Sequence, residues 1–484
     1  MKNKEKLIEL AYDYVIKMST TKKYNPQTIS NASCLRRYDK EKILKILSEP
    51  VEEFCRLYDP CKVRDFVYKS DYFTPRKMYL INPLYYTYYT YLVFQLSRLF
   101  LKNNFNLDFS RERMSLFYSG FLDLDPSKED IDKYAMYNES YKSFQKERES
   151  YFGNSVLKID IQDFFNSIRI NDLILKLRKL LGNKKIIDDL EYFFNFCGFD
   201  SLPQLHYSIA SSILSQFYLV EFDLKIQEIL ERENFWLLRF VDDMYIVDLD
   251  QGEDKSKFNN VLNVISYYLW EDSLVLNTSK TKILTPEQYQ NGYELFLSDY
   301  GYDESTSSFT SEKLVEERAM EVIEEGNLLF LVQELCKLEK ENGIDLVEYK
   351  RLIKEYISIK GEDENKVLNN IIFSRKWKDM DKKNLKKLIR NWKYILFNPS
   401  QFTILYIMVY RFLEKEKVVI DNGKKIKTIL NYLFRNDIFT FRDTLVAVSY
   451  LFQSGLKNKK LLYKIEKVNP GYVEFLETFV LDNY

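Results

Sequence analysis

The residues best suited to chemistry are two adjacent aspartates, Asp242 and Asp243. They lie between two short runs rich in large apolar residues, 236–241 and 244–247, which contain no Gly or Pro. These runs predict a strand, a tight turn and a second strand, with the acids at the tip. Adjacent carboxylates repel each other and lose hydration beside apolar strands, an arrangement usually tolerated where a cation neutralises it. The alternative is an Asp-Asp turn that only caps a hairpin.

A third carboxylate is expected to complete such a site. Neighbouring strand residues point to opposite faces, so Asp242 and Asp243 cannot serve one cation equally. Asp160 is the candidate, because it ends the largely apolar run 155–159 just before the chain turns helical near Asp163. A carboxylate placed where a strand leaves the core can reach a bound cation.

The composition narrows the classes of protein that remain. The chain has 484 residues, 46% hydrophobic and 30% charged, as expected for a soluble globular protein of two or three domains. Its 71 Lys and Arg balance 72 Asp and Glu, so any contact with nucleic acid must come from local basic patches. The single histidine, His206, excludes a two-histidine metalloprotease and a multi-histidine nuclease, and no GxSxG elbow accompanies it.

The cysteines and the amino terminus indicate a cytoplasmic chain. Five scattered cysteines without a CxxC pair do not form the pattern of a disulfide framework or a zinc site, and they suit a reducing cytoplasm. The mixed-charge amino terminus has no signal-peptide h-region. The apolar run 402–413 is too short for a bilayer and contains Arg411, so a buried helix and no membrane contact are expected.

Helices and short strands are expected to position these side chains. Residues 1–60 have helical periodicity, interrupted by the polar loop 19–26 that carries Tyr24. A basic strand bounded by prolines, 73–83, leads into an aromatic helix. This aromatic helix is expected at 85–100. The elements expected after it are a helix plus loop at 104–150, a helical pair at 171–200, a serine-rich helix after Pro203, helices at 224–232 and 258–270, and a strand with a polar turn at 274–284.

After residue 285, the composition predicts an α-solenoid or a helical bundle. A basic stretch from Arg375 to Trp392, which also contains Trp377, is either a track for single-stranded nucleic acid with stacking platforms or the solvated face of a helix. The predicted helices are 311–340, 345–359, 363–373, 381–396, 400–415, 424–435, 440–454 and 457–466.

Taken in order, five segments resemble the fingers and palm of a reverse transcriptase. The fingers strand corresponds to Arg76–Pro83 and the four palm motifs to Lys158–Ile168, Leu202–Gln204 with the serine-rich helix, Arg239–Asp243 and Leu274–Thr281. Four palm motifs in the right order and spacing favour a polymerase over a merely capped hairpin.

This resemblance implies a role for each matching residue. Asp160 and Asp242 would hold two Mg²⁺ ions, with Mn²⁺ as a substitute, and Asp243 would support them. The remaining assignments are Phe165 as the aromatic gate that selects deoxynucleotides, Gln204 as a lining of the nucleotide pocket, Arg76 and Lys77 as triphosphate ligands, and Lys280 as the proton donor to pyrophosphate. Arg76 and Lys77 also fit an ordinary solvated strand edge, and Lys280 a lone surface lysine.

Within reverse transcriptases, the chain resembles the abortive-infection (Abi, AbiK-like) class of bacterial antiphage polymerases. Leu205-His206 stands where a Gly usually follows the second motif, and neither the Val-Thr-Gly tripeptide of retron enzymes nor a zinc-bound endonuclease is evident. The Abi resemblance implies untemplated DNA synthesis primed by a protein tyrosine, and a closed homo-oligomer, a trimer or hexamer. The candidate primers are Tyr24, then Tyr38 and Tyr12.

The sequence therefore predicts an α+β fold: right-hand polymerase fingers and palm, with an antiparallel palm sheet and helices, followed by an all-α, helical-repeat domain. The expected domains are 1–60, 61–290 and 291–484. The expected partners are dNTPs and a single-stranded DNA product, covalently attached, in the bacterial cytoplasm. Two alternatives stay open: an RNA-templated, retron-like enzyme with a dedicated non-coding RNA, and a catalytically idle scaffold that binds nucleic acid.

Overall fold

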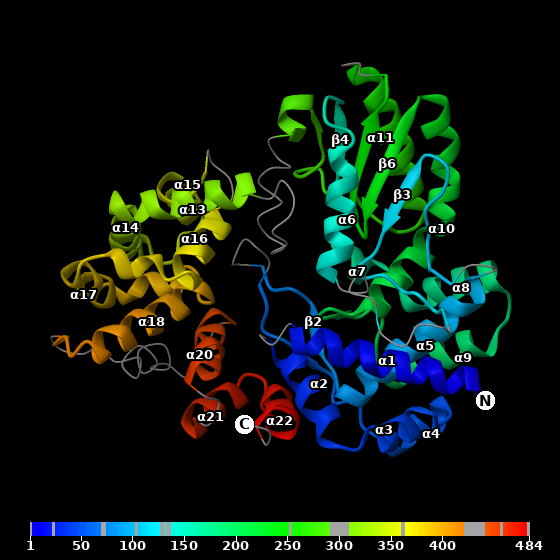
Figure 1. The fold of residues 1–484 in the computed structure, drawn as a ribbon, viewed down its shortest axis with the longest axis horizontal. Helices are drawn as coiled ribbons and strands as arrows, with labels where there is room; N and C mark the ends of the chain where they lie inside the picture. Colours follow the sequence, from blue (N-terminus) through cyan, green and yellow to red (C-terminus); the bar gives the residue numbers. More distant parts are fainter. Residues whose placement is uncertain are drawn as a thin grey trace. The chain divides into compact units, whose positions relative to one another are not determined.

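The chain folds into two compact units (Figure 1). Unit 1 comprises Met1–Arg64, Lys77–Tyr293 and Phe475–Asn483, and unit 2 comprises Asp65–Arg76, Glu294–Glu474 and Tyr484. The computed structural model describes residues 2–21, 25–68, 74–101, 105–125, 131, 137–250, 254–290, 309–359, 364–420, 441–454 and 458–481. The predicted α+β class is confirmed, whereas the predicted domain boundaries stay predictions.

A five-stranded sheet lies at the centre of unit 1, in the order β3-β6-β7-β4-β8. Its strands are β3 (Met114–Phe117), β4 (Val156–Ile159), β6 (Phe235–Phe240), β7 (Asp243–Asp248) and β8 (Lys282–Leu284). The predicted hairpin is confirmed as antiparallel β6 and β7, and β4 and β8 continue the antiparallel pairing. β3 runs parallel to β6 and was not predicted, because four residues inside a polar stretch carry too weak a periodicity.

Two helices cover opposite faces of this sheet, and Figure 1 shows both beside it. Phe144 of α6 (Tyr137–Glu149) packs against Phe240, whereas Asp223 of α10 (Ile209–Arg232) bonds to Arg239. Because adjacent strand residues point to opposite faces, these contacts place α6 on one face and α10 on the other. α10 is one continuous helix of 24 residues, where a serine-rich helix and a separate charged helix were predicted.

A second, three-stranded sheet completes unit 1, in the order β1-β2-β5. β2 pairs antiparallel with β1 and parallel with β5. The strands are β1 (Val63–Arg64), β2 (Met78–Leu80) and β5 (Gln204–Leu205). The remaining helices of this part of the chain are α1 (Lys2–Thr21), α2 (Pro26–Arg37), α3 (Lys40–Leu47), α4 (Val51–Leu57), α5 (Pro83–Phe100), α7 (Phe164–Ser167), α8 (Ile170–Leu181), α9 (Lys185–Phe196) and α11 (Lys255–Glu271).

The described part of unit 2 is built from helices. The predicted helix 311–340 is divided at Gly326, whose φ of 76° suits a residue without a side chain, and the predicted helix 381–396 is divided at Asn391. The prediction for 424–435 lies outside the described residues. The helices are α13 (Phe309–Glu324), α14 (Asn327–Asn342), α15 (Leu346–Tyr356), α16 (Glu364–Phe373), η3 (Lys376–Asp379), α17 (Lys382–Arg390), η4 (Trp392–Leu396), α18 (Gln401–Lys415), α20 (Phe441–Ser454) and α21 (Lys459–Glu466), and α22 (Pro470–Phe479) follows them.

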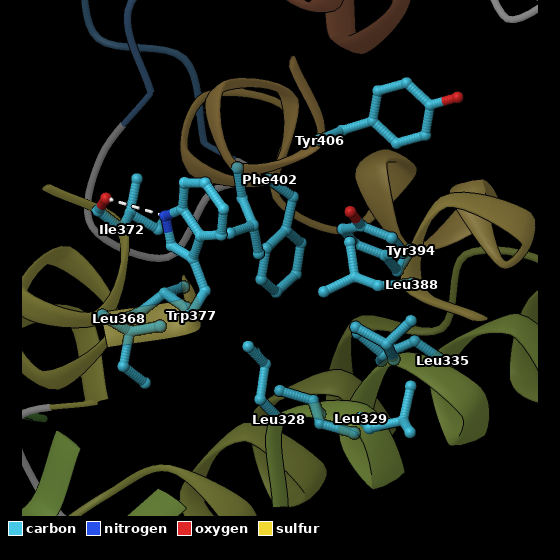
Figure 2. Packing of buried hydrophobic residues seen from close by; sticks show 14 of the residues in the cluster. Leu328, Leu329, Leu335, Leu368, Ile372, Trp377, Leu388, Tyr394, Phe402 and Tyr406 are labelled. Atoms are coloured by element: carbon cyan, nitrogen blue, oxygen red, sulfur yellow. Dashed lines mark hydrogen bonds between the residues drawn. The ribbon is translucent and has the colours of Figure 1, made fainter. Parts of the chain in front are cut away.

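The core of unit 2 is apolar and includes both tryptophans of the basic stretch. Figure 2 shows Trp377 packed among Leu368, Ile372 and Phe402, with its indole nitrogen donating to the Ile372 carbonyl at 3.3 Å. Trp377 is 1% exposed and Trp392 is 5% exposed. The interpretation of these residues as stacking platforms for a single strand is therefore wrong, because neither ring is available to a base.

Two other sequence expectations are confirmed. The apolar run at 402–413 lies within α18 and contributes Phe402, Leu405 and Leu413 to the core. All five cysteines are free thiols. None of the helices within the described ranges is long and apolar enough to cross a membrane.

Candidate active site

The β6–β7 hairpin presents Asp242 and Asp243 at its tip. Phe240 pairs with Asp243, so Val241 and Asp242 form a two-residue turn. Val241 has a φ of 57°, a left-handed conformation that strains a β-branched residue and persists only where the surroundings impose it. Its backbone N–H donates to the Phe117 carbonyl of β3 at 3.0 Å, so the unpredicted strand holds the strained turn in place.

Asp160 lies beside this tip because of strand register. Ile159 of β4 pairs with Met244 of β7, and the next position along the antiparallel pair brings Asp160 opposite Asp243. The Asp160 side chain is 13% exposed. The structure therefore brings together the three acids that the sequence analysis singled out.

Both carboxylate oxygens of Asp160 are already engaged. The Asn277 side-chain amide donates to one oxygen at 2.8 Å, and the Lys280 ammonium lies 3.1 Å from the other. The Asn277 backbone N–H also donates to the Asp160 carbonyl at 2.8 Å. Lys280 is 63% exposed, so the predicted residue reaches the acids from the solvent side.

The electrostatics of the tip favour a cation. Burial, followed by the charges of Asp243 and Asp160, raises the pKa of Asp242 to about 7. Burial is also the main cause of the raised pKa of Asp243, and the charge of Asp160 adds to it, against the opposing effects of Lys158, Lys280 and Arg148. Crowded, half-buried carboxylates of this kind are stabilised by a positive charge placed among them.

The donor chemistry of the three acids fits Mg²⁺, which prefers carboxylate oxygens. Among the described residues, however, no group of three or more His, Cys, Asp or Glu side chains is arranged to hold a metal ion. Asp160 directs its oxygens to Asn277 and Lys280 instead. The Lys280 ammonium, 3.1 Å from Asp160, therefore competes with a cation for this carboxylate, and the predicted ligand set stays a prediction.

The predicted nucleotide-pocket residues are distributed over several elements. Phe165 belongs to α7 and is half-buried against Phe164, with ring centroids 5.4 Å apart. Gln204 in β5 is half-buried and pairs with Met78 of β2. Lys77 precedes β2 in unit 1, whereas Arg76 belongs to unit 2, where its N–H donates to the Val67 carbonyl at 2.7 Å.

The departure after the second motif has a structural role. Leu205 is 6% exposed and pairs with Tyr79 of β2. The His206 carbonyl accepts a hydrogen bond from the Tyr86 hydroxyl at 2.8 Å, and Tyr207 has a φ of 56°. The His206 backbone thus ties this segment to the aromatic helix α5, and the Leu205 side chain is part of the packing.

The three candidate priming tyrosines differ in access. Tyr24 lies outside the described residues. Tyr12 is 7% exposed and donates its hydroxyl to the Leu35 carbonyl at 3.1 Å, and burial raises its pKa. Tyr38 caps the carboxyl end of α2 and is 58% exposed. Of the two described candidates, Tyr38 is the one whose side chain is accessible.

Two buried arginines near the tip were not predicted from the sequence. Arg239 is fully buried and bonds to Asp223 at 2.6 Å. Arg148 is 2% exposed, and its guanidinium lies 4.1 Å from the ring centre of Tyr245 and 5.1 Å from that of Tyr289. Asp223 and Arg239 are each a charged residue inside an apolar run, a pattern that could have predicted a buried charge. Arg148 lies in a highly charged stretch, where no such pattern distinguishes it.

Residues 319–477 match a family described as a domain of unknown function (DUF8609), a stretch that does not include the three acids. No curated protein matches the chain. Among solved structures, the chain is similar to telomerase from Candida albicans in complex with the TWJ fragment of telomeric RNA, with 13% identity and a TM-score of 0.24. That match covers 70% of this chain and 52% of the telomerase chain, about half of its length, and a TM-score of this size does not establish a shared fold.

Proposed function

We propose that this protein is a nucleotidyltransferase of reverse-transcriptase type, a DNA polymerase that requires Mg²⁺. The observation that carries the proposal is the meeting of Asp160 with Asp242 and Asp243 at the ends of paired strands, where their charges act on one another. Acids concentrated at the tip of a hairpin destabilise an apoprotein, and a divalent cation would offset that cost. The fingers-and-palm architecture is part of the same proposal.

Asp160, Asp242 and Asp243 would hold the divalent cation, which when bound supplies charge stabilisation for phosphoryl transfer. Asn277 orients Asp160 through two hydrogen bonds, one to the carboxylate and one to the backbone carbonyl. The strained Val241 turn, held by β3, sets the direction of Asp242. These residues act by positioning the acids.

Lys280 is the proposed proton donor to the leaving pyrophosphate. Its ammonium lies beside Asp160 and is 63% exposed, so the side chain can swing toward a bound substrate. An exposed lysine at the edge of an acidic site meets both requirements of a general acid, which are a proton at a defined nitrogen and access to the leaving group.

Deoxynucleoside triphosphates are the proposed substrates. Phe165 follows Asp160 by five residues on the short helix α7 and would exclude a 2′-hydroxyl. Gln204 would contact the nucleotide, and Lys77 would contact the triphosphate through its ammonium group. These three roles rest on the resemblance of the motifs.

We further propose that synthesis needs no template and is primed by a tyrosine. The near-balance of 71 basic and 72 acidic residues is unusual for a protein that grips a long template duplex. Tyr24 remains the first candidate and Tyr38, which is exposed, the second. The single-stranded DNA product would stay attached to a homo-oligomeric protein, a trimer or hexamer, that acts in antiphage defence in the bacterial cytoplasm.

The test uses full-length protein with Mg²⁺ and labelled dNTPs, without template or primer, followed by denaturing gels with and without protease. We expect label on the protein that protease releases, and no label with Asp242→Asn/Asp243→Asn. The matched control is Asp188→Asn/Asp189→Asn, which removes the adjacent acid pair of α9 and should retain activity.

Other results of this labelling experiment would support one of the two alternative functions or identify the priming residue. Label that appears only with an RNA template and annealed primer would favour the retron-like enzyme. A wild-type protein that incorporates no dNTP under either condition would contradict the polymerase and favour the idle scaffold. Peptide mapping of the labelled protein would decide between Tyr24 and Tyr38.

A further inference from the structure

The basic stretch from Arg375 to Trp392 concentrates positive charge at one place in unit 2. It contains eight Lys and Arg and two Asp, an excess of six positive charges in a chain whose net charge is −1. In a chain that is otherwise balanced, such an excess produces a local positive field. Ion pairs offset part of it, since Lys376 is paired with Glu316 and Lys382 with Glu416.

The helix α17 carries lysines that have no acidic partner. Its nine residues, Lys382–Arg390, include no Asp or Glu. Among the residues that the structure describes, no acid pairs with Lys383, Lys386 or Lys387. Other helices of unit 2 differ in this respect. In α15, for example, Arg351 is paired with both Glu348 and Glu355.

These three lysines lie on one face of α17. They occupy positions i, i+3 and i+4, which are neighbours on a helix surface, and the exposed Arg390 follows at i+7. The apolar residues Leu385, Leu388 and Ile389 lie on the opposite face and are at most 1% exposed. They belong to the core of unit 2, where Figure 2 shows Leu388. Because the apolar face is held in the core, the basic face points to the surface.

Helix stability does not explain this arrangement. Like charges at these spacings repel each other and destabilise a helix. Lys383 also lies in the first turn, two residues after the capping residue Asp381, where the helix dipole disfavours a positive charge. Acids interspersed among the lysines, as in α15, would stabilise α17 better. The arrangement therefore indicates a partner that carries negative charge.

The surroundings of the basic face favour a nucleic acid over a membrane or an acidic protein. In the described segment 375–417, none of the large apolar side chains is exposed. A helix that binds a membrane surface inserts its apolar face, and that of α17 is buried. Protein interfaces are centred on apolar or aromatic anchors. A nucleic-acid backbone requires neither, because its affinity comes from Lys and Arg that neutralise phosphates.

We propose that this face of α17 binds the phosphate backbone of one nucleic-acid strand. Lys383 and Lys387 lie about 6 Å apart along the helix axis, so they can contact neighbouring phosphates. Since its opposite face is packed in the core, α17 cannot enter a groove and contacts a single strand. Trp377 and Trp392 are buried, so the binding involves no base stacking and no preference for base or sugar. It does not require the acids of the hairpin tip.

The experiment measures the fluorescence anisotropy of labelled oligothymidylate, about 15 nucleotides long, with the full-length chain at several salt concentrations. Lys383→Gln/Lys386→Gln/Lys387→Gln should raise the Kd at least about tenfold at about 0.1 M salt. It should also reduce the slope of log Kd against log salt by about 2, because each phosphate contact with a single strand contributes about 0.7. Oligouridylate should bind within about twofold of oligothymidylate, because phosphate contacts do not distinguish the sugar.

Two further variants make the test specific. Lys337→Gln/Lys340→Gln/Lys354→Gln removes the same charge from α14 and α15, where acids accompany the lysines, and its Kd should stay within about twofold of the wild type. The variant with Arg at positions 383, 386 and 387 keeps the charge and should bind at least as tightly as the wild type. The melting temperature of the α17 glutamine variant should be unchanged or higher, since Gln is a good helix former and the repulsion is removed.

Several results would overturn the inference. One is a wild-type chain that does not bind the oligonucleotide, and another is an α17 glutamine variant with an unchanged Kd and salt slope. Equal weakening in the α14 and α15 control would mean a general effect of net charge. If the triple variant does not fold, Lys383→Gln/Lys387→Gln decides, with an expected rise in Kd of at least about threefold. If the substitutions weaken binding to phosphatidylserine vesicles or to polyglutamate but not to the oligonucleotide, the partner is a membrane or an acidic protein.

The proposed function can fail separately. A wild-type chain that binds the oligonucleotide through α17 but incorporates no dNTP would contradict the polymerase and leave this surface intact. A chain that incorporates dNTPs but binds the oligonucleotide equally well without the three lysines would overturn only this inference.

Discussion

At the scale of single residues, Asp242 carries the largest electrostatic cost of the tip. Burial and the neighbouring acids raise its pKa to about 7, well above its ordinary value near 4. The folded state therefore binds the proton more tightly than the unfolded state does. Folding stability from this group is present below about pH 4 and is lost as the pH rises toward 7.

This sign leads to a stability prediction for Asp242→Asn. The substitution removes the charge at every pH, so the variant should be more stable than the wild type at pH 8, by about 1 kcal/mol after allowance for solvent screening. The gain should disappear near pH 4. Urea unfolding at both pH values measures it, and Asp188→Asn is the control without a gain. A loss of stability at pH 8 would contradict the electrostatic account of the tip.

At the scale of elements, α10 connects the two sheets of unit 1. Its Asp223 bonds to Arg239 of the five-stranded sheet. Its Ser211 donates to the Pro203 carbonyl at 2.7 Å, directly before β5 of the smaller sheet. The Ser211 hydroxyl also lies 3.2 Å from the Tyr89 hydroxyl of α5. A serine buried in a helix therefore holds Pro203, the residue directly before the predicted nucleotide contact Gln204.

Ser211→Ala should destabilise unit 1 by about 1–2 kcal/mol, because it leaves the Pro203 carbonyl and the Tyr89 hydroxyl without this partner. Tyr89→Phe removes one of the two affected groups. Because the residues share a hydrogen bond, the double variant should lose less than the sum of the single losses. Denaturant unfolding of the three variants measures the difference. Strictly additive losses would show that the bond between Ser211 and Tyr89 contributes nothing.

At the scale of the whole molecule, unit 2 has an apolar core of its own. Trp377 is surrounded by Leu368, Ile372 and Phe402, and its indole N–H is bonded within the same cluster (Figure 2). Two lysines of the stretch are paired with acids: Lys376 lies 2.7 Å from Glu316 and Lys382 lies 3.1 Å from Glu416. This basic stretch therefore contributes core packing on one side and ion pairs on the other.

Trp377→Ala should destabilise unit 2 by about 3–5 kcal/mol through the cavity that it creates. Trp270→Ala is the matched control, because Trp270 is 69% exposed and its loss should cost less than about 0.5 kcal/mol. Helical circular dichroism during thermal unfolding follows both variants. If Trp377→Ala melts like the wild type, the core of unit 2 is not organised around this side chain.

The sequence by itself determined the local elements and the identity of the acids. Short apolar runs on both sides of Asp242 and Asp243 are sufficient to predict a hairpin, and the apolar run that ends at Asp160 predicts a strand, because the pattern of apolar residues shows which segments are buried. This pattern does not show which other element of the fold packs against an apolar face. The pairing of β3 with β6, the anchoring of Arg239 by Asp223, the engagement of Asp160 by Asn277 and Lys280, and the burial of Trp377 all join residues far apart in the chain. Only the tertiary structure decided them, because their energies come from contacts that exist once distant segments are packed together.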